Sequence, residues 1–226
     1  MYYIIISSPS GGGKTTICNM LLSNKNSPIY GNVSFSISAT TRPKRQHEVH
    51  GREYFFLSKE EFKVMIDNNE FLEYANVCGN LYGTPLKGVV EYHHTLFDID
   101  YQGFEQISRN GKATIISIFL LPPSLKELEQ RLQNRGDISQ SVINERMQNA
   151  LEEISHSQKY NYILTNFNIQ TTFQMVCKIV DYTIHGNDDI LHKNAISLAN
   201  LIKGFSNKNV ELYLKEALKV TQNACC

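Results

Sequence analysis

The sequence constrains its own fold most strongly at residues 8–15, which read S-P-S-G-G-G-K-T. This segment follows an apolar, β-branched run at 1–7 and precedes apolar residues at helical spacing over 15–22. A glycine-rich turn between a strand and a helix directs several backbone N–H groups, and the positive end of the helix dipole, at one point. We therefore predict a phosphate-binding loop at residues 8–16.

The residues of this loop suit the chemistry of a nucleoside triphosphate. Lys14 has the reach to contact the β and γ phosphates, and the Thr15 hydroxyl is a ligand type for Mg²⁺. Ser8 stands where the motif has its first glycine; because Pro9 biases it toward extended backbone, we expect Ser8 to end the strand. The alternative is an ordinary glycine-rich turn with a surface lysine. The residues expected to bind the nucleotide are Ser8, Pro9, Ser10, Gly11, Gly12, Gly13, Lys14, Thr15 and Thr16.

Composition limits the class of protein and its partners. The 226 residues suffice for one domain with a small inserted subdomain, and 42% hydrophobic with 19% charged residues is ordinary for a globular protein. A formal net charge of +0 gives no bulk field for nucleic acid or an acidic membrane. Five scattered cysteines without a C-x-x-C pair predict reduced thiols, and the apolar N-terminus is too short for a signal peptide. We expect a cytoplasmic protein with no nucleic-acid or membrane partner.

Strand and helix patterns alternate along the chain. Apolar or alternating runs predict strands at 33–38, 54–57, 71–77, 96–99, 113–121 and 162–165. Helices are expected at 59–68 and 125–132, behind capping boxes led by Ser58 and Ser124, and at 86–92, 142–157 and 173–184. We predict an α/β fold with a mostly parallel sheet and helices on both faces. The short strands clustered at about 33–95 are interpreted as an insertion on that sheet.

A basic segment lies in the polar stretch 40–52, which is expected to be a loop. It holds Arg42 and Arg45 beside several hydroxyl residues. Arginine presents a planar fork of donors that suits phosphate oxygens. A solvated basic loop is the alternative, and the segment alone does not decide between the two.

Several motifs occur in a fixed order and together resemble one family. After the phosphate loop come S-I-S-A-T-T-R-P-K-R at 36–45, G-R-E-Y at 51–54, F-L-E at 71–73, G-N-L-Y-G-T at 79–84 and D-I-D-Y-Q-G at 98–103. The ordered set closely resembles the guanylate kinases over about residues 3–185. The resemblance implies a P-loop nucleoside monophosphate kinase fold at 1–185, with a GMP-binding insertion at about 33–95 and a lid at about 131–146.

The resemblance implies an acceptor site for GMP. Its phosphate is expected to be held by Arg42, Arg45, Tyr54 and Tyr82, and its guanine to be surrounded by Ser38, Glu73, Thr84 and Asp100. Guanine has N–H donors at N1 and N2 beside the O6 acceptor, so a carboxylate accepts from the former and a hydroxyl donates to the latter. Without the family pattern, Tyr54 and Tyr82 would be interpreted as half-buried tyrosines and Glu73 as a surface acid.

Two acids lie at the carboxyl end of the strand predicted at 96–99. An acid at the carboxyl end of a strand beside a phosphate loop often orients Mg²⁺, directly or through water. Asp98 and Asp100 both meet this description, and the sequence leaves open which of them assists Thr15.

The R-L-Q-N-R-G pattern at 131–136 resembles the family's lid, in which arginines close over ATP and neutralise the transferred group. We expect Arg135 and Arg146 to act in this way and Arg131 to bind ATP. The alternative is a set of solvated arginines at helix ends. Asn166 stands where the family contacts adenine, although Phe167 and Asn168 replace the acidic pair usual there. Arg135 and Arg146, with Lys14 and Arg42, are the expected catalytic residues.

Residues 186–226 lie beyond the resemblance. A helical pattern at 210–220 predicts an amphipathic helix used for packing or for a dimer contact, and a mobile appendage is the alternative. The oligomeric state, monomer or homodimer, stays open. The histidines show no metal-ligand spacing, and His93 and His94 are interpreted as a surface or helix-end pair.

The expected reaction is ATP plus GMP giving ADP and GDP, dependent on Mg²⁺, with dGMP as a second acceptor. Such phosphoryl transfer needs positioning and charge neutralisation rather than a nucleophile and base, and no such pair is visible. Two alternatives are a non-catalytic guanylate-kinase-like module that binds proteins and a kinase for another nucleoside monophosphate.

Overall fold

A five-stranded, fully parallel sheet forms the centre of the protein. The computed structural model describes residues 1–77, 79–89, 93–111, 113–134 and 139–186. The sheet has the strand order β2-β7-β1-β8-β9, and every neighbouring pair is parallel. Its strands are β1 (Tyr2–Ser7), β2 (Val33–Phe35), β7 (His94–Asp98), β8 (Thr114–Leu121) and β9 (Tyr162–Thr165).

Helices cover both faces of this sheet, as the strand side chains require. In β1, Ile4 and Ile6 belong to a core cluster with α1 (Lys14–Ser23) and α6 (Ile169–His185). Tyr3 and Ile5 point to the other face, toward α3 (Tyr101–Asn110) and α5 (Gln140–Ser155). A sheet buried on both faces explains the continuous apolar runs of β1 and β8. The predicted α/β architecture is confirmed.

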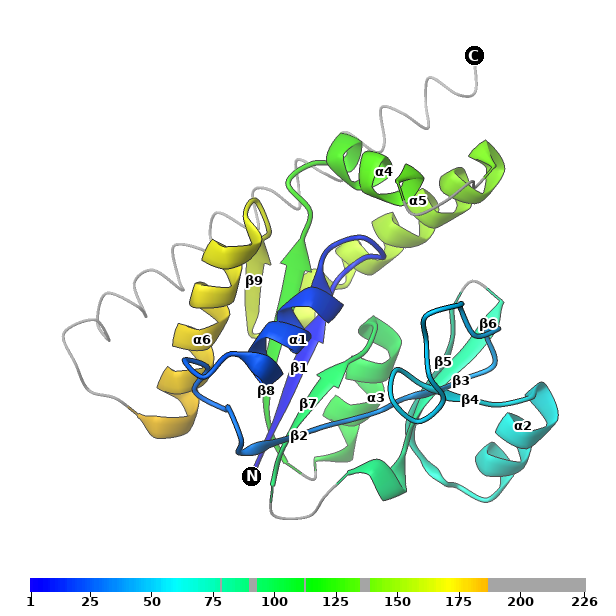
Figure 1. The fold of residues 1–226 in the computed structure, drawn as a ribbon, viewed down its shortest axis with the longest axis horizontal. Coiled ribbons are helices and arrows are strands. Elements are labelled where there is room, and N and C mark those ends of the chain that lie inside the picture. Colours follow the sequence, from blue (N-terminus) through cyan, green and yellow to red (C-terminus); the bar gives the residue numbers. More distant parts are fainter. Residues whose placement is uncertain (78, 90–92, 112, 135–138, 187–226) are drawn as a thin grey trace.

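A smaller mixed sheet lies to one side of the larger one (Figure 1). Its order is β4-β3-β6-β5, with β4 parallel to β3 and the other pairs antiparallel. Helix α2 (Lys59–Asp67) starts at the predicted capping box, in which Ser58 and Glu61 bond each other's backbone N–H. The strands are β3 (Ala39–Thr40), β4 (Phe55–Phe56), β5 (Phe71–Val77) and β6 (Asn80–Pro85).

The smaller sheet covers fewer residues than the insertion predicted at about 33–95. β2 ends at Phe35, three residues earlier than predicted, and pairs with β7 in the larger sheet, so the second sheet covers only residues 39–85. β3 was not predicted: Thr40 is the first residue of the predicted loop and Ala39 directly precedes it, yet both pair with strands on either side. β6 was missed, because its polar N-L-Y-G-T-P sequence lacks strand alternation. Of the helix predicted at 86–92, the structure has a 3₁₀ turn at Leu86–Gly88, and 90–92 lie outside the described residues.

Helix α3 was also missed, and its first turn shows why. Gly103 weakens the helical pattern there, yet it is required, because a Cβ at this position would lie 2.5 Å from Glu73 Oε2. The Asp100 side chain begins the helix by accepting a hydrogen bond from the Gly103 N–H at 3.0 Å. A contact with a distant strand therefore selects the glycine, and a side-chain cap compensates for its low helix propensity.

Helices α4 (Leu125–Gln133) and α5 form an arm that projects above the carboxyl ends of the strands (Figure 1). Leu128, Leu132 and Ala150 pack between the two helices. Ser124 caps α4 as predicted by accepting from the Glu127 N–H. Residues 135–138 and 187–226, with the predicted helix at 210–220, lie outside the described residues. No helix in the part of the chain described is long and apolar enough to cross a membrane.

Candidate active site

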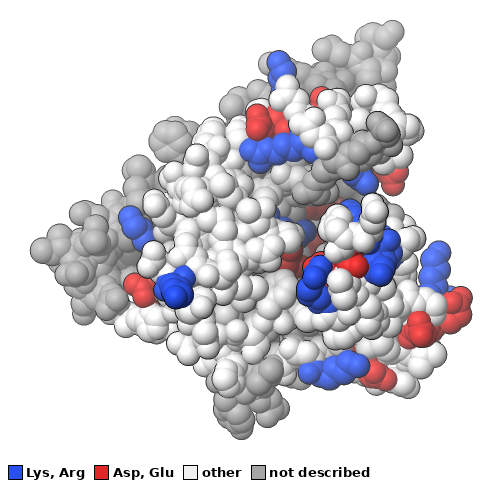
Figure 2. Space-filling view, viewed as in Figure 1, with Lys and Arg blue, Asp and Glu red and all other residues white. Residues whose placement is uncertain are grey.

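The phosphate loop, the arm and the smaller sheet border one hollow. Figure 2 shows this hollow with basic and acidic atoms inside it and further basic side chains on the rim of the smaller sheet. Because the large sheet is parallel, the carboxyl ends of β1, β7, β8 and β9 all lie at its base. Ligand sites in such folds lie at this edge of the sheet. The predicted site residues that the structure describes come from the phosphate loop, the smaller sheet and its loops, the end of β7, the arm and the end of β9.

The phosphate loop takes the tight path that its glycines predict. Gly11 and Gly13 have φ angles of 93° and 100°, in the left-handed region that favours glycine. The Gly12 N–H donates to the Pro9 carbonyl at 2.8 Å, and a Cβ on Gly12 would lie 2.7 Å from Ser8 Cβ. Ser8 is buried directly after β1, and its hydroxyl donates to the Pro9 carbonyl at 2.9 Å. A serine therefore fits at the position where the motif has glycine.

The Asn166 side chain holds the phosphate loop through a hydrogen bond to its backbone. Its amide nitrogen donates to the Gly12 carbonyl at 2.9 Å, and its amide oxygen accepts from the Thr172 hydroxyl at 3.0 Å. The side chain is buried where β9 ends, and it lies so close to Gly13 that a Cβ there would be 2.5 Å from its nitrogen. The adenine contact expected of Asn166 stays a prediction. In this structure its side chain holds the backbone of the phosphate loop.

Lys14 and Thr15 both meet Asp98, the last residue of β7. Lys14 Nζ lies 3.6 Å from Asp98 Oδ1, and the Thr15 hydroxyl donates to Asp98 Oδ2 at 2.6 Å. Burial alone would lower the pKa of Lys14, but the attraction of Asp98 and then of Glu153 outweighs it and raises that pKa above its ordinary value. Asp100 instead caps α3. The contact with the loop is therefore made by Asp98.

Glu73 and Thr84 form a buried pair between β5 and β6. The Thr84 hydroxyl donates to Glu73 Oε1 at 2.6 Å, and the Ser36 hydroxyl lies 3.5 Å from that of Thr84. Glu73 Oε2 faces Gly103, at the start of the helix that Asp100 caps. Burial raises the pKa of Glu73 to about 7. Three of the residues expected around guanine are thus brought together, and Ser36 and Gly103 are neighbours that the sequence did not indicate.

The raised pKa of Glu73 predicts a pH-dependent stability. Its ordinary pKa is 4.5, and the folded value is about 7, so the folded state binds the proton more tightly. The tighter proton binding by Glu73 increases the free energy of unfolding by at most about 3 kcal/mol. This stabilisation is complete below the unfolded pKa and is lost as the pH rises through about 7. Glu73→Gln should flatten the fall in urea-unfolding free energy over this interval, and the exposed Glu70→Gln should not. A wild-type slope in Glu73→Gln would contradict the assignment.

Glu48 organises the basic loop, a role that the sequence did not indicate. Arg42 donates to both oxygens of the buried Glu48 carboxylate, at 3.1 and 2.8 Å, and the Arg45 N–H donates to it at 2.8 Å. The hydrogen bonds from Arg42 hold the pKa of Glu48 below its ordinary value. The signal was one acid placed a few residues after two arginines. Glu48 holds Arg42 in place and leaves the more exposed Arg45 guanidinium, 3.9 Å away, at the rim.

Aromatic rings complete the wall on which Arg42 lies. Its guanidinium carbon is 5.5 Å from the Tyr54 ring centre and 5.8 Å from that of Phe56. Tyr54 meets Tyr82 edge to face at 5.9 Å. Ser38, directly before β3, is buried, and its carbonyl accepts a hydrogen bond from the Phe55 N–H of β4 at 2.9 Å. Three of the four residues expected to hold a phosphate, Arg42, Tyr54 and Tyr82, are thus gathered on one wall, and the Arg45 guanidinium lies at its rim.

The expected lid arginines are only partly described. Arg131, on α4, pairs with Glu127 at 3.1 Å, and its Cβ lies 3.7 Å from the position of a Cβ on Gly11. Arg146 is half-buried on α5. Arg135 lies outside the described residues. The structure therefore places Arg131 beside the phosphate loop, and the roles of all three arginines stay predictions.

Comparison with known proteins identifies the family. A family model described as guanylate kinase matches residues 1–183. The chain belongs to the guanylate kinase family. It is 44% identical over 181 residues to a guanylate kinase of Agrobacterium fabrum, covering 78% of this chain and 80% of the relative. It is 45% identical over 180 residues to one of Novosphingobium aromaticivorans, covering 78% and 79%.

A solved structure of the same family confirms the fold. The crystal structure of guanylate kinase from Anaplasma phagocytophilum superposes with a TM-score of 0.63 at 32% sequence identity, covering 80% of this chain and 85% of the other. With the parallel sheet and its helices, this confirms the predicted P-loop nucleoside monophosphate kinase fold. The resemblance inferred from the ordered motifs is confirmed as well.

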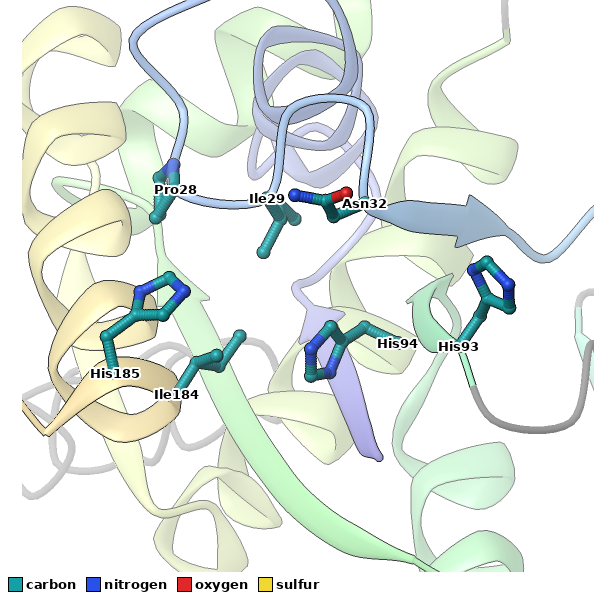
Figure 3. Close-up of a pocket in the computed structure, with 7 residues that line it drawn as sticks. All are labelled: Pro28, Ile29, Asn32, His93, His94, Ile184 and His185. Atoms are coloured by element: carbon teal, nitrogen blue, oxygen red, sulfur yellow. The ribbon is translucent and has the colours of Figure 1, made fainter.

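A second depression lies at the opposite end of the larger sheet. Figure 3 shows His94, at the start of β7, and His185, at the end of α6, pointing toward each other across it. His94 Nδ1 accepts from the Tyr2 N–H at 3.2 Å, and His185 Nδ1 lies 2.8 Å from Asp181, so both nitrogens are engaged. Within the described ranges, no group of three or more His, Cys, Asp or Glu side chains is suited to hold a metal ion. The depression measures about 280 Å³ and is lined by Pro28, Ile29, Asn32, His93, His94, Ile184 and His185.

Proposed function

We propose that this protein transfers the γ-phosphoryl group of ATP to GMP, giving ADP and GDP. One observation carries the proposal: Asp98, which contacts Lys14 and Thr15, lies two residues before Asp100, which caps the helix whose Gly103 faces the buried Glu73. Lys14 is close enough to Tyr54 and Asp100 for both to raise its pKa. The donor phosphates would thus lie beside the expected acceptor site, as a direct transfer between two bound nucleotides requires.

The acceptor site has the hydrogen-bonding groups that guanine needs. The buried Glu73 carboxylate is proposed to accept from the N1 and N2 donors, and Asp100 to extend this acidic edge. The Ser38 and Thr84 hydroxyls are proposed to face the remaining polar edge of the base. Adenine presents the opposite pattern at that edge, and a site whose buried polar groups stay unpaired discriminates by about 10⁴ to 10⁵. The GMP phosphate is proposed to bind Arg42, Arg45, Tyr54 and Tyr82.

Positive charge surrounds the position of the migrating phosphoryl group. Lys14 and Arg42 are proposed to contact it from the two nucleotide sites, and Arg135 and Arg146 from the lid. Phosphoryl transfer spreads negative charge over the equatorial oxygens, so preorganised cations stabilise the transition state. Arg131 and Asn166 are proposed to support ATP binding, together with the loop residues from Ser8 to Thr16.

The oxygen ligands of the site fit Mg²⁺. Thr15 and Asp98 supply hard oxygen atoms in direct contact, and Asp98 Oδ1 has no hydrogen-bond partner among the described residues. We therefore propose that Thr15 and Asp98, rather than Asp100, hold the metal, with Asp98 acting directly or through water. When bound with ATP, Mg²⁺ neutralises phosphate charge.

A panel of acceptors tests the function. With Mg-ATP and GMP, dGMP, AMP, UMP or dTMP, we expect turnover only with GMP and, more weakly, dGMP, measured as ADP release in a coupled assay. Preference for AMP or dTMP would overturn the assignment of Glu73 and Asp100. Turnover with no acceptor would favour the protein-binding alternative, which the intact Lys14, Arg42 and Arg146 argue against.

A further inference from the structure

The peptide group between Gly12 and Gly13 lies where the backbone of the phosphate loop has the most freedom. Both residues lack a Cβ, so rotation about the bonds on either side of this peptide meets little steric resistance. Gly13 is the N-cap residue of α1, with a φ angle of 100°, and it has no side chain that could cap the helix. The orientation of this peptide therefore depends on a contact from another part of the chain.

The Asn166 side chain makes that contact. Its Nδ2 donates to the Gly12 carbonyl at 2.9 Å, and a Cβ on Gly13 would lie 2.5 Å from the same nitrogen, so the amide packs directly against the peptide. In a trans peptide the C=O and the N–H point in opposite directions. Holding the Gly12 carbonyl toward Asn166 therefore turns the Gly13 N–H away from it. Gly13 is partly exposed, and its N–H forms no hydrogen bond with another residue in the described ranges.

Thr172 holds the Asn166 amide at its other end. The Thr172 hydroxyl donates to Asn166 Oδ1 at 3.0 Å, and each of the two residues is only 4% exposed. The Asn166 N–H donates to the Leu121 carbonyl of β8 at 2.8 Å, and the Thr172 N–H donates to the Asn168 carbonyl in the first turn of α6 at 2.9 Å. The central sheet and α6 thus fix the backbones of both partners, and the amide between them is held at its oxygen and at its nitrogen.

Only one orientation of the Asn166 amide suits both of its neighbours. The Gly12 carbonyl can only accept, so the amide nitrogen has to face it and the amide oxygen has to face Thr172. Without the Thr172 hydroxyl, Asn166 Oδ1 would be a buried acceptor that has lost its donor, which is unfavourable. The side chain would then gain by rotating its oxygen toward water, and the Gly12 carbonyl would lose the group that holds it.

We propose that Thr172 is a positioning residue of the donor site, and that it acts through Asn166 to direct the Gly13 N–H at the phosphates of ATP. The inference rests on the proposed function in one respect, namely that the phosphate loop binds the donor phosphates. An N–H that already points at the anion stabilises it without a rearrangement of the loop. If the peptide took this orientation only part of the time, the affinity for phosphate would fall by that fraction.

The test measures by calorimetry the dissociation constants of inorganic tripolyphosphate, ADP and GMP in the presence of Mg²⁺. Tripolyphosphate has the phosphates of the donor and no base. Thr172→Val removes the hydroxyl and keeps the branched shape, so the constants for tripolyphosphate and ADP should both rise about tenfold, while that for GMP stays within about twofold. Thr172→Ser restores the hydroxyl and should bind all three like the wild type. The matched control is Thr171→Val, at an exposed threonine one position earlier, which should also behave like the wild type.

A double variant tests whether Thr172 acts through Asn166. Asn166→Ala should weaken tripolyphosphate binding at least as much as Thr172→Val does, and adding Thr172→Val to it should change the constant by less than about twofold. A further tenfold loss in the double variant would show that the two residues act independently and would overturn the inference. Thermal unfolding of each variant checks that it is folded, and the comparison of valine with serine at position 172 stands without the alanine variant.

Three other results would overturn the inference. The first is wild-type affinity for tripolyphosphate in Thr172→Val. The second is a loss confined to ADP, which would assign the effect to the base instead of the phosphates. The third is an equal loss for GMP or in Thr171→Val, which would indicate a general structural defect.

Failure of this inference is distinguishable from failure of the proposed function, because tripolyphosphate binding needs neither an acceptor nor phosphoryl transfer. The expected pattern in a protein that phosphorylates no acceptor would support the role of Thr172 and refute the proposed function. Turnover with GMP, together with equal tripolyphosphate affinity in the wild type and Thr172→Val, would do the reverse.

Discussion

Replacing Lys14 by alanine is expected to reduce kcat by at least about 10³-fold while the protein stays folded. The ammonium is the cationic group of the phosphate loop itself, and it faces Asp98 Oδ1 at 3.6 Å. Truncating it removes the cation that would follow the migrating phosphoryl group, and removes no residue of the hydrophobic core. The loss should therefore fall on the chemical step.

The measurement is the rate of ADP formation at saturating ATP and GMP, with thermal unfolding as the check on folding. Lys63→Ala is the matched control, because Lys63 is an exposed lysine on α2, away from the phosphate loop. Activity within about tenfold of the wild type in a folded Lys14→Ala protein would be incompatible with the proposed mechanism.

Replacing Arg42 by lysine is expected to raise the KM for GMP by about 100-fold with little change in the KM for ATP. Lysine keeps the positive charge but loses the fork that contacts both oxygens of Glu48 and stacks on Tyr54. The point charge would hold neither Glu48 nor the acceptor phosphate in a two-point geometry. Acceptor binding should therefore suffer more than donor binding.

Lysine is the informative replacement because alanine would leave Glu48 buried without its cation, at a cost of about 3 to 5 kcal/mol in unfolding free energy. Arg52→Lys is the control, since Arg52 is an arginine of the same loop that pairs with Glu53 at the surface. The two KM values are taken from initial rates with one nucleotide varied at a time. An Arg42→Lys protein with an unchanged KM for GMP would remove Arg42 from the acceptor site.

The parts of the fold predicted correctly are those that short segments specify. β9 covers the predicted residues 162–165, and α2 begins at its predicted capping box. Both depend on neighbours in sequence: an apolar run in the first case, and a Ser58–Glu61 exchange of hydrogen bonds in the second. β3 and β6 were not predicted, because their hydrogen-bond partners lie up to about 40 residues away and their own side chains carry no alternation.

The site residues show the same difference between what a short segment specifies and what depends on contacts with other residues. Residues 8–15 build the phosphate loop locally, so its position and chemistry were readable from one segment. Glu48 was missed because its meaning arises only when it lies against Arg42 and Arg45.

The sequence by itself determined the phosphate loop, the alternation of strands and helices, and the family, since each is carried by contiguous residues or by motifs in a fixed order. Only the tertiary structure decided that Asp98 meets Thr15 and that Gly103 makes room for Glu73. The physical reason is distance along the chain. Hydrogen bonds and close contacts between residues about 30 to 80 positions apart depend on how the strands are ordered in a sheet, and no local pattern contains that order.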